Sequence, residues 1–513
     1  MKTKSTLLCL VSVLFTNAFI TVYAQAVNKQ DSLALVDLYN STDGSNWVDH
    51  TNWLTKQPLR TWYGIIVTGN RVTGLNLNVN NLNGTISSSI GNLVKLTFLY
   101  LGLNQLKGSI PSSIGNLVNV DDLRINENEL SGSIPSSMGN LKNLSYLALH
   151  HNQLSRLPNS IGNLQNLQYL DASSNQLGGS IPSSIGNCKN LGWLDLSYNQ
   201  LNSIPSLLGG AKNIYYLDLS NNKLNGSIPA SLGNLVNLGN LFLSNNQLTG
   251  NIPSSLGHLL KIENMYLDNN QLSGSIPFSI SNVGGGNIHI LNLSHNKLSG
   301  KIPSSFANFA SSIEVNLSYN HFTFDGMEMV ARKLPAVYDH QALIPVQQNG
   351  NTISVSAGGT LKNNTYRWIR VTKTSKILVA TISGDSVFHP LQNGIYLARV
   401  TNSVATGLTL RSDTIHYTVS DDFAESASAF SENLMQQNDK TKFFLVYPNP
   451  AKNILHVRIN GNALFSLSDQ SGKILLTTSI NREGSINISG MAAGLYYLRN
   501  NSTGAAQKII IER

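Results

Sequence analysis

Aromatic residues and aspartates recur at nearly equal spacing in the middle of this sequence. Four aromatic residues follow one another at steps of 23 or 24 residues, and an aspartate stands two positions after each of the last three. The aromatic residues are Tyr146, Tyr169, Trp193 and Tyr216, and the aspartates are Asp171, Asp195 and Asp218. Side chains two positions apart on a strand share one face, so each of these acids is expected beside a ring. Rings stack on apolar faces while carboxylates accept hydrogen bonds, a combination that could recognise a sugar or a basic peptide.

Two other interpretations of these residues stay open. Aromatic side chains in line can pack against one another and stiffen a sheet. Adjacent carboxylates can share a proton or bind a cation, as acid–base pairs do. However, Leu-Asp-Leu-Ser also belongs to the consensus of the repeat. His150 and His151 point differently along one strand, and no third metal ligand accompanies them. The sequence contains no hydrolase, zinc, phosphate-loop or dinucleotide motif, so we expect no catalytic residue, no metal and no cofactor.

A repeat must position these residues. The unit LxxLxLxxNxLxGxIPxxIGNL occurs eleven times, with steps of 23 to 26 residues between its central asparagines. Leu-x-Leu places two leucines on an inward face, and the asparagine amide can bond to turn backbone. The Gly and Pro of GxIP then turn the chain into a short helical segment. Because one coil cannot bury its leucines alone, the coils are expected to stack into one continuous core.

The variable positions beside the leucines predict the binding surface. They project from the concave sheet of such a stack and repeat about every 4.8 Å from coil to coil. Phe242 and Tyr266 continue the column of the aspartates, and Tyr198 lies beyond that column. The predicted ligand-binding residues are Tyr146, Tyr169, Trp193, Tyr216, Asp171, Asp195, Asp218, Tyr198, Phe242 and Tyr266.

The repeat resembles the plant-type leucine-rich repeat of receptor ectodomains and polygalacturonase-inhibiting proteins. The resemblance implies an α/β-type leucine-rich-repeat solenoid of about eleven coils over residues 71–325, with a parallel β-sheet on its concave face. Residues 25–70 resemble the N-terminal cap of bacterial members. Plant members pin this cap with cysteines, whereas here Trp47, Trp53 and Trp62 are expected to cover the open end of the core.

The N-terminus and the composition predict an exported protein. Residues 1–24 have the charged start, apolar stretch and small-residue cleavage site of a signal peptide. Its removal takes away Lys2, Lys4 and Cys9, which leaves a net charge of +6 and one cysteine, Cys188, at a repeat leucine position. The basic excess is spread along the chain, so neither nucleic acid nor an anionic membrane is an expected partner. No later segment is long and apolar enough for a transmembrane helix.

Two small all-β sandwich domains are predicted after the array. Residues 340–420 contain short alternating strands and resemble an immunoglobulin-like sandwich, with Tyr396 at the position of a tyrosine corner. Residues 421–442 are polar and predict a linker. Residues 443–513 contain turns every 8–12 residues and resemble the C-terminal sorting domain of type IX secretion cargo. That resemblance implies contact with the secretion machinery, a secreted or outer-surface location, and possible attachment to surface polysaccharide.

The leading hypothesis is therefore a secreted or cell-surface protein that binds a protein or glycan ligand on the concave face of its solenoid, in adhesion or recognition. An alternative, implied by the resemblance, is an inhibitor of a secreted glycoside hydrolase such as polygalacturonase. A hydrolase is a weaker alternative, since many cargo proteins of this secretion route are hydrolases.

Overall fold

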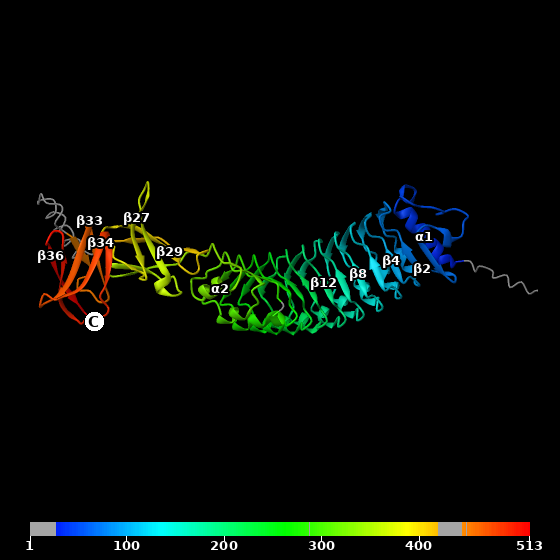
Figure 1. Ribbon diagram of the computed structural model, residues 1–513. Helices are drawn as coiled ribbons and strands as arrows, with labels where there is room; N and C mark the ends of the chain where they lie inside the picture. The colour runs from blue at the N-terminus through cyan, green and yellow to red at the C-terminus, as the bar shows by residue number, and fades with distance from the viewer. Residues whose placement is uncertain (1–26, 287, 419–443, 448, 513) are drawn as a thin grey trace, which may run out of the picture. The chain divides into compact units, whose positions relative to one another are not determined.

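The computed structural model describes residues 27–286, 288–418, 444–447 and 449–512 (Figure 1). The predicted signal peptide (1–24) and linker (421–442) lie outside these residues. The chain forms two compact units, and each is described by itself. The first holds the repeat array and most of the segment up to Ile415, and the second holds mainly His416–Arg513. Within the described part of the chain, no helix has the length and hydropathy needed to cross a membrane.

One strand from each coil builds the sheet that carries the candidate site. The sheet has thirteen strands, of which β1 pairs antiparallel with β2 and all later neighbours pair in parallel. In sheet order the strands are β1 (Ile65–Thr68), β2 (Arg71–Asn76), β4 (Phe98–Tyr100), β6 (Asp122–Arg124), β8 (Tyr146–Ala148), β10 (Tyr169–Asp171), β12 (Trp193–Asp195), β14 (Tyr216–Asp218), β16 (Asn240–Phe242), β18 (Asn264–Tyr266), β20 (Ile290–Asn292), β22 (Glu314–Asn316) and β23 (Ala336–Val337). The central leucines of these strands, such as Leu170 and Leu194, are fully buried. The predicted leucine-rich-repeat fold class is confirmed.

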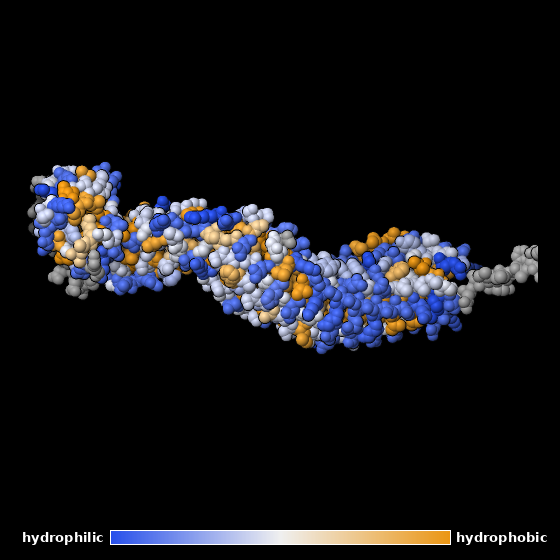
Figure 2. Space-filling view, turned by 60° about the horizontal axis from the view of Figure 1, so that its bottom comes forward, coloured by the Kyte–Doolittle hydropathy of each residue, from blue (hydrophilic) through white to orange (hydrophobic). Residues whose placement is uncertain are grey.

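Each coil returns through a short strand and a 3₁₀ helix. The short strands are β3 (Asn83–Thr85), β5 (Gln105–Ser109), β7 (Glu129–Ser133), β9 (Gln153–Arg156), β11 (Gly178–Ser180), β13 (Gln200–Ser203), β15 (Asn225–Ser227), β17 (Gln247–Gly250), β19 (Gln271–Gly274) and β21 (Lys297–Leu298). The 3₁₀ helices are η3 (Ser88–Asn92), η4 (Ser112–Asn116), η5 (Ser136–Asn140), η6 (Asn159–Asn163), η7 (Ser183–Asn187), η8 (Ser206–Gly210), η9 (Ala230–Asn234), η10 (Ser254–His258), η11 (Phe278–Gly286) and η12 (Ser304–Asn308). Glycine is required in η4, because a Cβ on Gly115 would lie 2.4 Å from the Ser137 carbonyl oxygen. The array surface seen in Figure 2 is mostly polar, with small separate apolar groups.

The central asparagines form a regular internal ladder. We call it the asparagine ladder, and it comprises Asn80, Asn104, Asn128, Asn152, Asn175, Asn199, Asn222, Asn246, Asn270, Asn296 and Asn320. Asn199 is typical: its Nδ2 donates to the carbonyls of Ala172, Leu196 and Ser197, at 2.9 to 3.1 Å. Its Oδ1 accepts from the Leu177 amide at 2.9 Å. From Asn104 to Asn320 each asparagine therefore satisfies turn backbone in two coils, which keeps the buried polar groups paired. Asn80, the first of the ladder, bonds instead to the Asp49 backbone of the cap.

Tryptophans and a salt bridge close the N-terminal end of the array. Helix α1 (Lys29–Ser41) precedes the turns η1 (Gly44–Asn46) and η2 (Leu59–Thr61). Trp47, Trp53 and Trp62 are at most 7% exposed, and neighbouring rings among them lie 4.8 and 4.9 Å apart. Asp31, fully buried in α1, binds the Arg71 guanidinium in bidentate fashion and also accepts from the Val72 amide. These contacts fasten the cap to the first repeat strand.

The sheet continues one strand beyond the predicted end of the repeats at residue 325. After helix α2 (Met327–Lys333), strand β23 pairs with β22. Gln341 then takes the place of a ladder asparagine: its Nε2 donates to three carbonyls, and its Oε1 accepts from the Phe322 amide. The sequence pattern ended earlier because this last coil lacks the leucines and the asparagine of the consensus.

Antiparallel strands follow the array. They are β24 (Val346–Asn349), β25 (Thr352–Val355), β26 (Asn364–Val371), β27 (Lys376–Ser383), β28 (Val387–Phe388), β29 (Gly394–Asn402), β30 (Thr409–Arg411) and β31 (Ile415–Tyr417), with the turn η13 (Leu361–Asn363) before β26. Trp368 in β26 is fully buried and stacks on Phe388. Glu328 in α2 accepts hydrogen bonds from Thr360, Asn363 and Asn402, which ties these strands to the end of the array.

The C-terminal module is also all-β. Its strands are β32 (Phe444–Tyr447), β33 (Ile454–Asp469), β34 (Ile474–Asn487), β35 (Gly494–Asn500) and β36 (Ala506–Ile511), and all named pairs are antiparallel. Phe465, Leu467 and Leu498 belong to its own buried core. The prediction of all-β domains after the solenoid is confirmed.

Candidate ligand-binding face

Parallel register brings the predicted site residues together on one face of the long sheet. Tyr169 lies opposite Tyr146 on one side and Trp193 on the other, and Trp193 lies opposite Tyr216. Asp195 lies opposite Asp171 and Asp218 in the same way. We call Asp171, Asp195 and Asp218 the acid row. Each strand contributes one ring and, two residues later, one acid, so strands β10, β12 and β14 together build a two-column surface.

The four rings stack on one another. Ring centroids are 4.1 Å apart for Tyr146 and Tyr169, 5.7 Å for Tyr169 and Trp193, and 3.6 Å for Trp193 and Tyr216. The corresponding interplanar angles are 2°, 20° and 3°. Both faces of Tyr169 and of Trp193 are therefore covered by neighbouring rings. Their edges rather than their faces are thus left open, although the indole nitrogen of Trp193 is itself buried.

The stack extends beyond the four predicted rings. Toward the C-terminus, the ring centroid of Phe242 lies 5.5 Å from that of Tyr216 and 5.3 Å from that of Tyr266. Toward the N-terminus, the Arg124 guanidinium lies 4.4 Å from the centre of the Tyr146 ring and 4.8 Å from that of Tyr100. We call the whole series the ring ladder: Phe98, Tyr100, Arg124, Tyr146, Tyr169, Trp193, Tyr216, Phe242 and Tyr266.

Arg124 is neutralised within its own strand. Its guanidinium donates two hydrogen bonds, of 2.9 and 2.7 Å, to the two carboxylate oxygens of Asp122. The Tyr100 hydroxyl donates to the same carboxylate at 2.8 Å. The Asp122 carboxylate raises the pKa of Arg124 further, and burial followed by Asp122 raises the pKa of Tyr100 to about 12. The N-terminal end of the ring ladder thus carries no unpaired charge.

One oxygen of each acid in the row holds the following turn. Oδ1 of Asp195 accepts from the backbone amide and the hydroxyl of Ser197, at 2.9 and 2.7 Å. Asp171 makes the same pair of contacts with Ser173, and Asp218 accepts from the Ser220 amide. Among the residues that the structure describes, only Ser197 donates a hydrogen bond to Asp195. The acids therefore have a structural role that uses part of each carboxylate.

Asparagine performs this turn role elsewhere in the array. Asn292 accepts from the amide and hydroxyl of Ser294, and Asn316 does so from Ser318. The turn requires an oxygen acceptor and no negative charge. The charge on the acid row is thus additional to what the fold needs.

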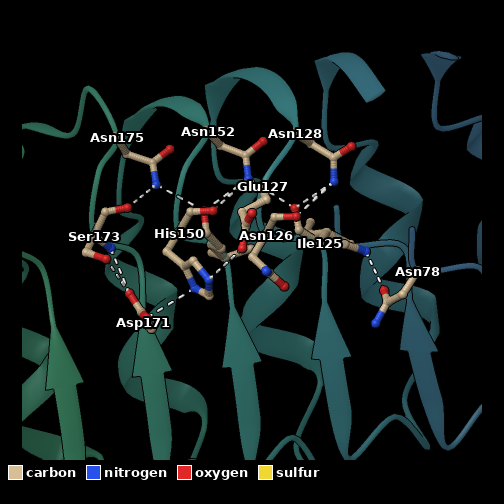
Figure 3. A network of polar contacts seen from close by, with 12 residues as sticks. Asn78, Ile125, Asn126, Glu127, Asn128, His150, Asn152, Asp171, Ser173 and Asn175 are labelled. Atoms are coloured by element: carbon tan, nitrogen blue, oxygen red, sulfur yellow. Dashed lines mark hydrogen bonds and ion pairs between the residues drawn. The ribbon is translucent and has the colours of Figure 1, made fainter. Parts of the chain in front are cut away.

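His150 is the only cationic group that contacts the acid row within the described residues. Its Nδ1 lies 3.1 Å from Oδ2 of Asp171, which is an ion pair although the angle is not that of a hydrogen bond, and its Nε2 lies 3.9 Å from the Glu127 carboxylate. Figure 3 shows the imidazole reaching from its own coil toward Asp171 in the next. The Asp171 carboxylate raises the pKa of His150, against the effect of burial. Burial alone would raise the pKa of Asp171, but His150 and Ser173 lower it.

The other two acids lack such a partner, and their pKa values rise. Burial, with the neighbouring charges of Asp218 and Asp171, raises the pKa of Asp195 to about 6 despite the hydrogen bonds from Ser197. Burial is also the main cause that raises the pKa of Asp218. No group of three or more histidine, cysteine or acidic side chains in the described residues is placed to hold a metal ion.

The structure brings nine of the ten predicted residues into one surface. Tyr198 differs: it is 62% exposed, has a left-handed backbone (φ 52°) and makes no ring contact among the described residues. Sequence reasoning missed the roles of Arg124 and Tyr100, although both stand in the aspartate column and could have been read as its continuation. It also missed the His150–Asp171 pair. Cys188 is buried in the core, as its leucine position predicted.

Comparison with known proteins finds two families along the chain. The leucine-rich repeat region matches residues 70–177 and 137–320, and the secretion system C-terminal sorting domain matches residues 445–512. No curated protein matches the sequence.

Similar solved structures include plant receptors. The crystal structure of PEPR1–AtPEP1 is 31% identical over 62% of this chain and 48% of that chain, with a TM-score of 0.53. The plant peptide hormone receptor RGFR1 in complex with RGF2 is 37% identical over 52% of this chain and 43% of the receptor, with a TM-score of 0.49. A leucine-rich-repeat protein of Leptospira interrogans is 30% identical over 52% and 67% of the two chains, with a TM-score of 0.43. This chain spans less than half the length of either plant receptor chain.

Proposed function

This chain is a leucine-rich-repeat protein with a type IX secretion sorting domain, and we propose that it binds a basic segment of another extracellular polypeptide on the ring ladder and acid row. The sorting domain makes it a secreted or cell-surface protein. A leucine-rich-repeat fold like that of receptor ectodomains is typical of binding rather than catalysis. The proposal adds where the ligand binds and what its chemistry is.

The observation that carries the proposal is the coincidence of the acid row with the stacked rings in the same coils. Three carboxylates stand side by side on β10, β12 and β14, and within the described part of the chain only His150 offsets their charge. Asn292 and Asn316 accept the same hydrogen bonds from the following turn without carrying a charge. The negative charges of the three acids therefore have a role other than folding. Lysine and arginine side chains of a ligand complement such a row.

The stacked rings favour a polypeptide over a glycan. A sugar ring needs an open aromatic face, and both faces of Tyr169 and Trp193 are occupied by neighbours. The Tyr169 hydroxyl donates to Asp171, and the Trp193 indole N–H is buried, so neither is an open donor for a sugar. The acid row supplies hydrogen-bond acceptors instead, which suit the cationic side chains of a basic polypeptide.

The test is a capture experiment with arrays of polypeptides and glycans, probed with the exported chain. The test variant carries Tyr169→Asn, Trp193→Asn and Tyr216→Asn, because Asn240 and Asn264 already occupy this column in the next two coils. The matched control carries Asn240→Ala, Asn264→Ala and Ile290→Ala in that same column. We expect basic polypeptides to bind, the test variant to lose at least about 100-fold in affinity, and the control to keep it. Unchanged capture by the test variant would refute the site, and capture of glycans alone would refute the ligand class.

A further inference from the structure

We infer that His150 and the acid row act as a pH-sensitive gate on the binding face, which holds a cationic ligand near neutral pH and releases it on acidification. The inference rests on the proposed function, because it concerns the regulation of that same site. On acidification the net charge of the binding face changes, whereas its shape does not.

The geometry of the gate is a row of charged groups on consecutive coils. His150 follows strand β8 and lies between Glu127 of the preceding coil and Asp171 of the following one, at 3.9 and 3.1 Å. Asp195 and Asp218 continue the row on the next two strands, in register with Asp171. Figure 3 shows the imidazole between the two carboxylates. A proton gained by any of these groups makes the face less negative.

Other titratable and charged groups lie around the row. The His151 ring is next to that of His150, with ring centroids 5.8 Å apart. On β6, Arg124 and Asp122 neutralise each other. On β8, β10 and β14 the other titratable side chains are tyrosines, and burial and the nearby aspartates raise the pKa values of Tyr169 and Tyr216 still further above the physiological range. Farther along, Asp268 accepts from Ser244 and Asn269. Among the described residues, no lysine or arginine forms an ion pair with Asp171, Asp195 or Asp218.

Protonation of His150 and of Asp195 acts in the same direction. Burial, followed by the charges of Asp218 and Asp171, raises the pKa of Asp195 to about 6. This carboxyl group therefore gains its proton as the pH falls from neutral to mildly acidic values. The pKa of His150 is raised by Asp171, against the effect of burial, so acidification makes the imidazole cationic more readily than an ordinary histidine. Asp171 stays ionised because His150 and Ser173 lower its pKa. Acidification therefore makes the face less negative, because Asp195 loses its negative charge while His150 gains a positive one.

The gate can be measured without any ligand. In the exported chain, the histidine ring signal that disappears in His150→Gln identifies His150 by NMR. We expect it to titrate above the ordinary range, and Asp171→Asn to lower its midpoint. In parallel, the carboxyl carbon signal that disappears in Asp195→Asn should titrate near pH 6. Midpoints at ordinary values for both groups would overturn the gate, whatever the ligand proves to be.

The effect on binding is measured with fluorescein-labelled nona-arginine at constant ionic strength. We expect the dissociation constant of the unmodified chain to rise about tenfold or more between about pH 7.5 and about pH 5, because the face becomes less negative. The variant with His150→Gln and Asp195→Asn should bind with an affinity that barely changes over this range. Asparagine at 195 keeps the turn, as Asn292 and Asn316 show.

A second histidine–aspartate pair provides the matched control. His340 Nδ1 lies 2.6 Å from Asp339 Oδ2, away from the acid row. The variant with Asp339→Asn and His340→Gln should keep the full pH dependence. Nona-arginine binding that is equally strong at both pH values would overturn the gate and leave the proposed function standing. If nona-arginine binds at neither pH, the proposed ligand class is wrong, and the NMR titration alone decides the gate.

Discussion

The asparagine ladder and the ring ladder run along the same coils, yet they differ in extent and in contacts. The central asparagine is kept in every coil from Asn80 to Asn320, and from Asn104 onward each bonds to backbone in the same way, as Asn104 and Asn199 do. The ring ladder instead covers only part of the array, changes residue type from coil to coil, and contacts other side chains. Beyond Tyr266 its position is taken by Asn292 and Asn316.

This difference separates what the fold requires from what the surface adds. A group that the backbone needs recurs without exception, because every coil has the same turn to satisfy. A group that is confined to a few coils has no counterpart in the rest of the structure, which folds without it. The acid row and the rings are of the second kind. Four variants test the comparison, from the largest expected effect on stability to the smallest.

Asn199→Ala should be the most destabilising change. Asn199 is buried and makes four hydrogen bonds to backbone, so its loss leaves several buried polar groups of two coils unpaired. We expect a loss of about 3–5 kcal/mol in the free energy of unfolding, measured by guanidinium denaturation. The control is Asn213→Ala, which removes one exposed hydrogen bond to the Lys189 carbonyl and should cost less than about 1 kcal/mol. Equal costs for the two variants would contradict a special role for the asparagine ladder.

Asp195→Asn should stabilise the protein at neutral pH. The folded-state pKa of Asp195, about 6, lies above the ordinary 3.8, so ionisation costs stability as pH rises from about 4 to above 6. Asparagine keeps the turn and avoids that cost. We expect a gain of about 1–2 kcal/mol at about pH 7.5, and no gain at about pH 3.5, where Asp195 is protonated in both states. A loss of stability at neutral pH would show that the acid serves the fold, as the asparagine ladder does.

Arg124→Met tests the end of the ring ladder. The change removes the guanidinium between Tyr100 and Tyr146 and leaves the Asp122 carboxylate with the Tyr100 hydroxyl but no cation, at a partly exposed site. We expect a loss of about 1 kcal/mol and a changed near-UV circular dichroism of the stacked rings. Arg124→Lys keeps the positive charge but loses the planar guanidinium. Its free energy of unfolding should therefore lie between those of the unmodified chain and Arg124→Met. A cost as large as that of Asn199→Ala would remove the distinction between the two ladders.

The sequence was sufficient to predict the solenoid and the columns of its sheet. Leucine spacing decides which side chains point inward, and the period of two in each strand places rings and acids on the opposite face. The sequence pattern did not predict the C-terminal coil, because Gln341 replaces the asparagine there. The structure shows that the Gln341 amide makes the same hydrogen bonds to backbone carbonyls.

The contacts within the site were beyond sequence reasoning. Register places Tyr169 beside Trp193, but side-chain rotamers decide whether ring faces point outward or cover one another. The His150–Asp171 pair joins a residue after one strand to a residue on the next, at positions that no repeat consensus links. Arg124 stands in the aspartate column with the opposite charge, and only its Asp122 partner shows that it is neutralised.

Tyr198→Asn should have the smallest effect. The side chain is 62% exposed without a ring contact, and its left-handed backbone suits asparagine, which occupies the same position as Asn221, Asn245 and Asn269. We expect the free energy of unfolding to change by less than about 0.5 kcal/mol and ligand affinity by less than about twofold. Denaturation and capture of a basic polypeptide would measure the two. If affinity falls as far as in the triple ring variant, the ligand crosses the rim of the sheet, and the boundary drawn here around the ring ladder is too narrow.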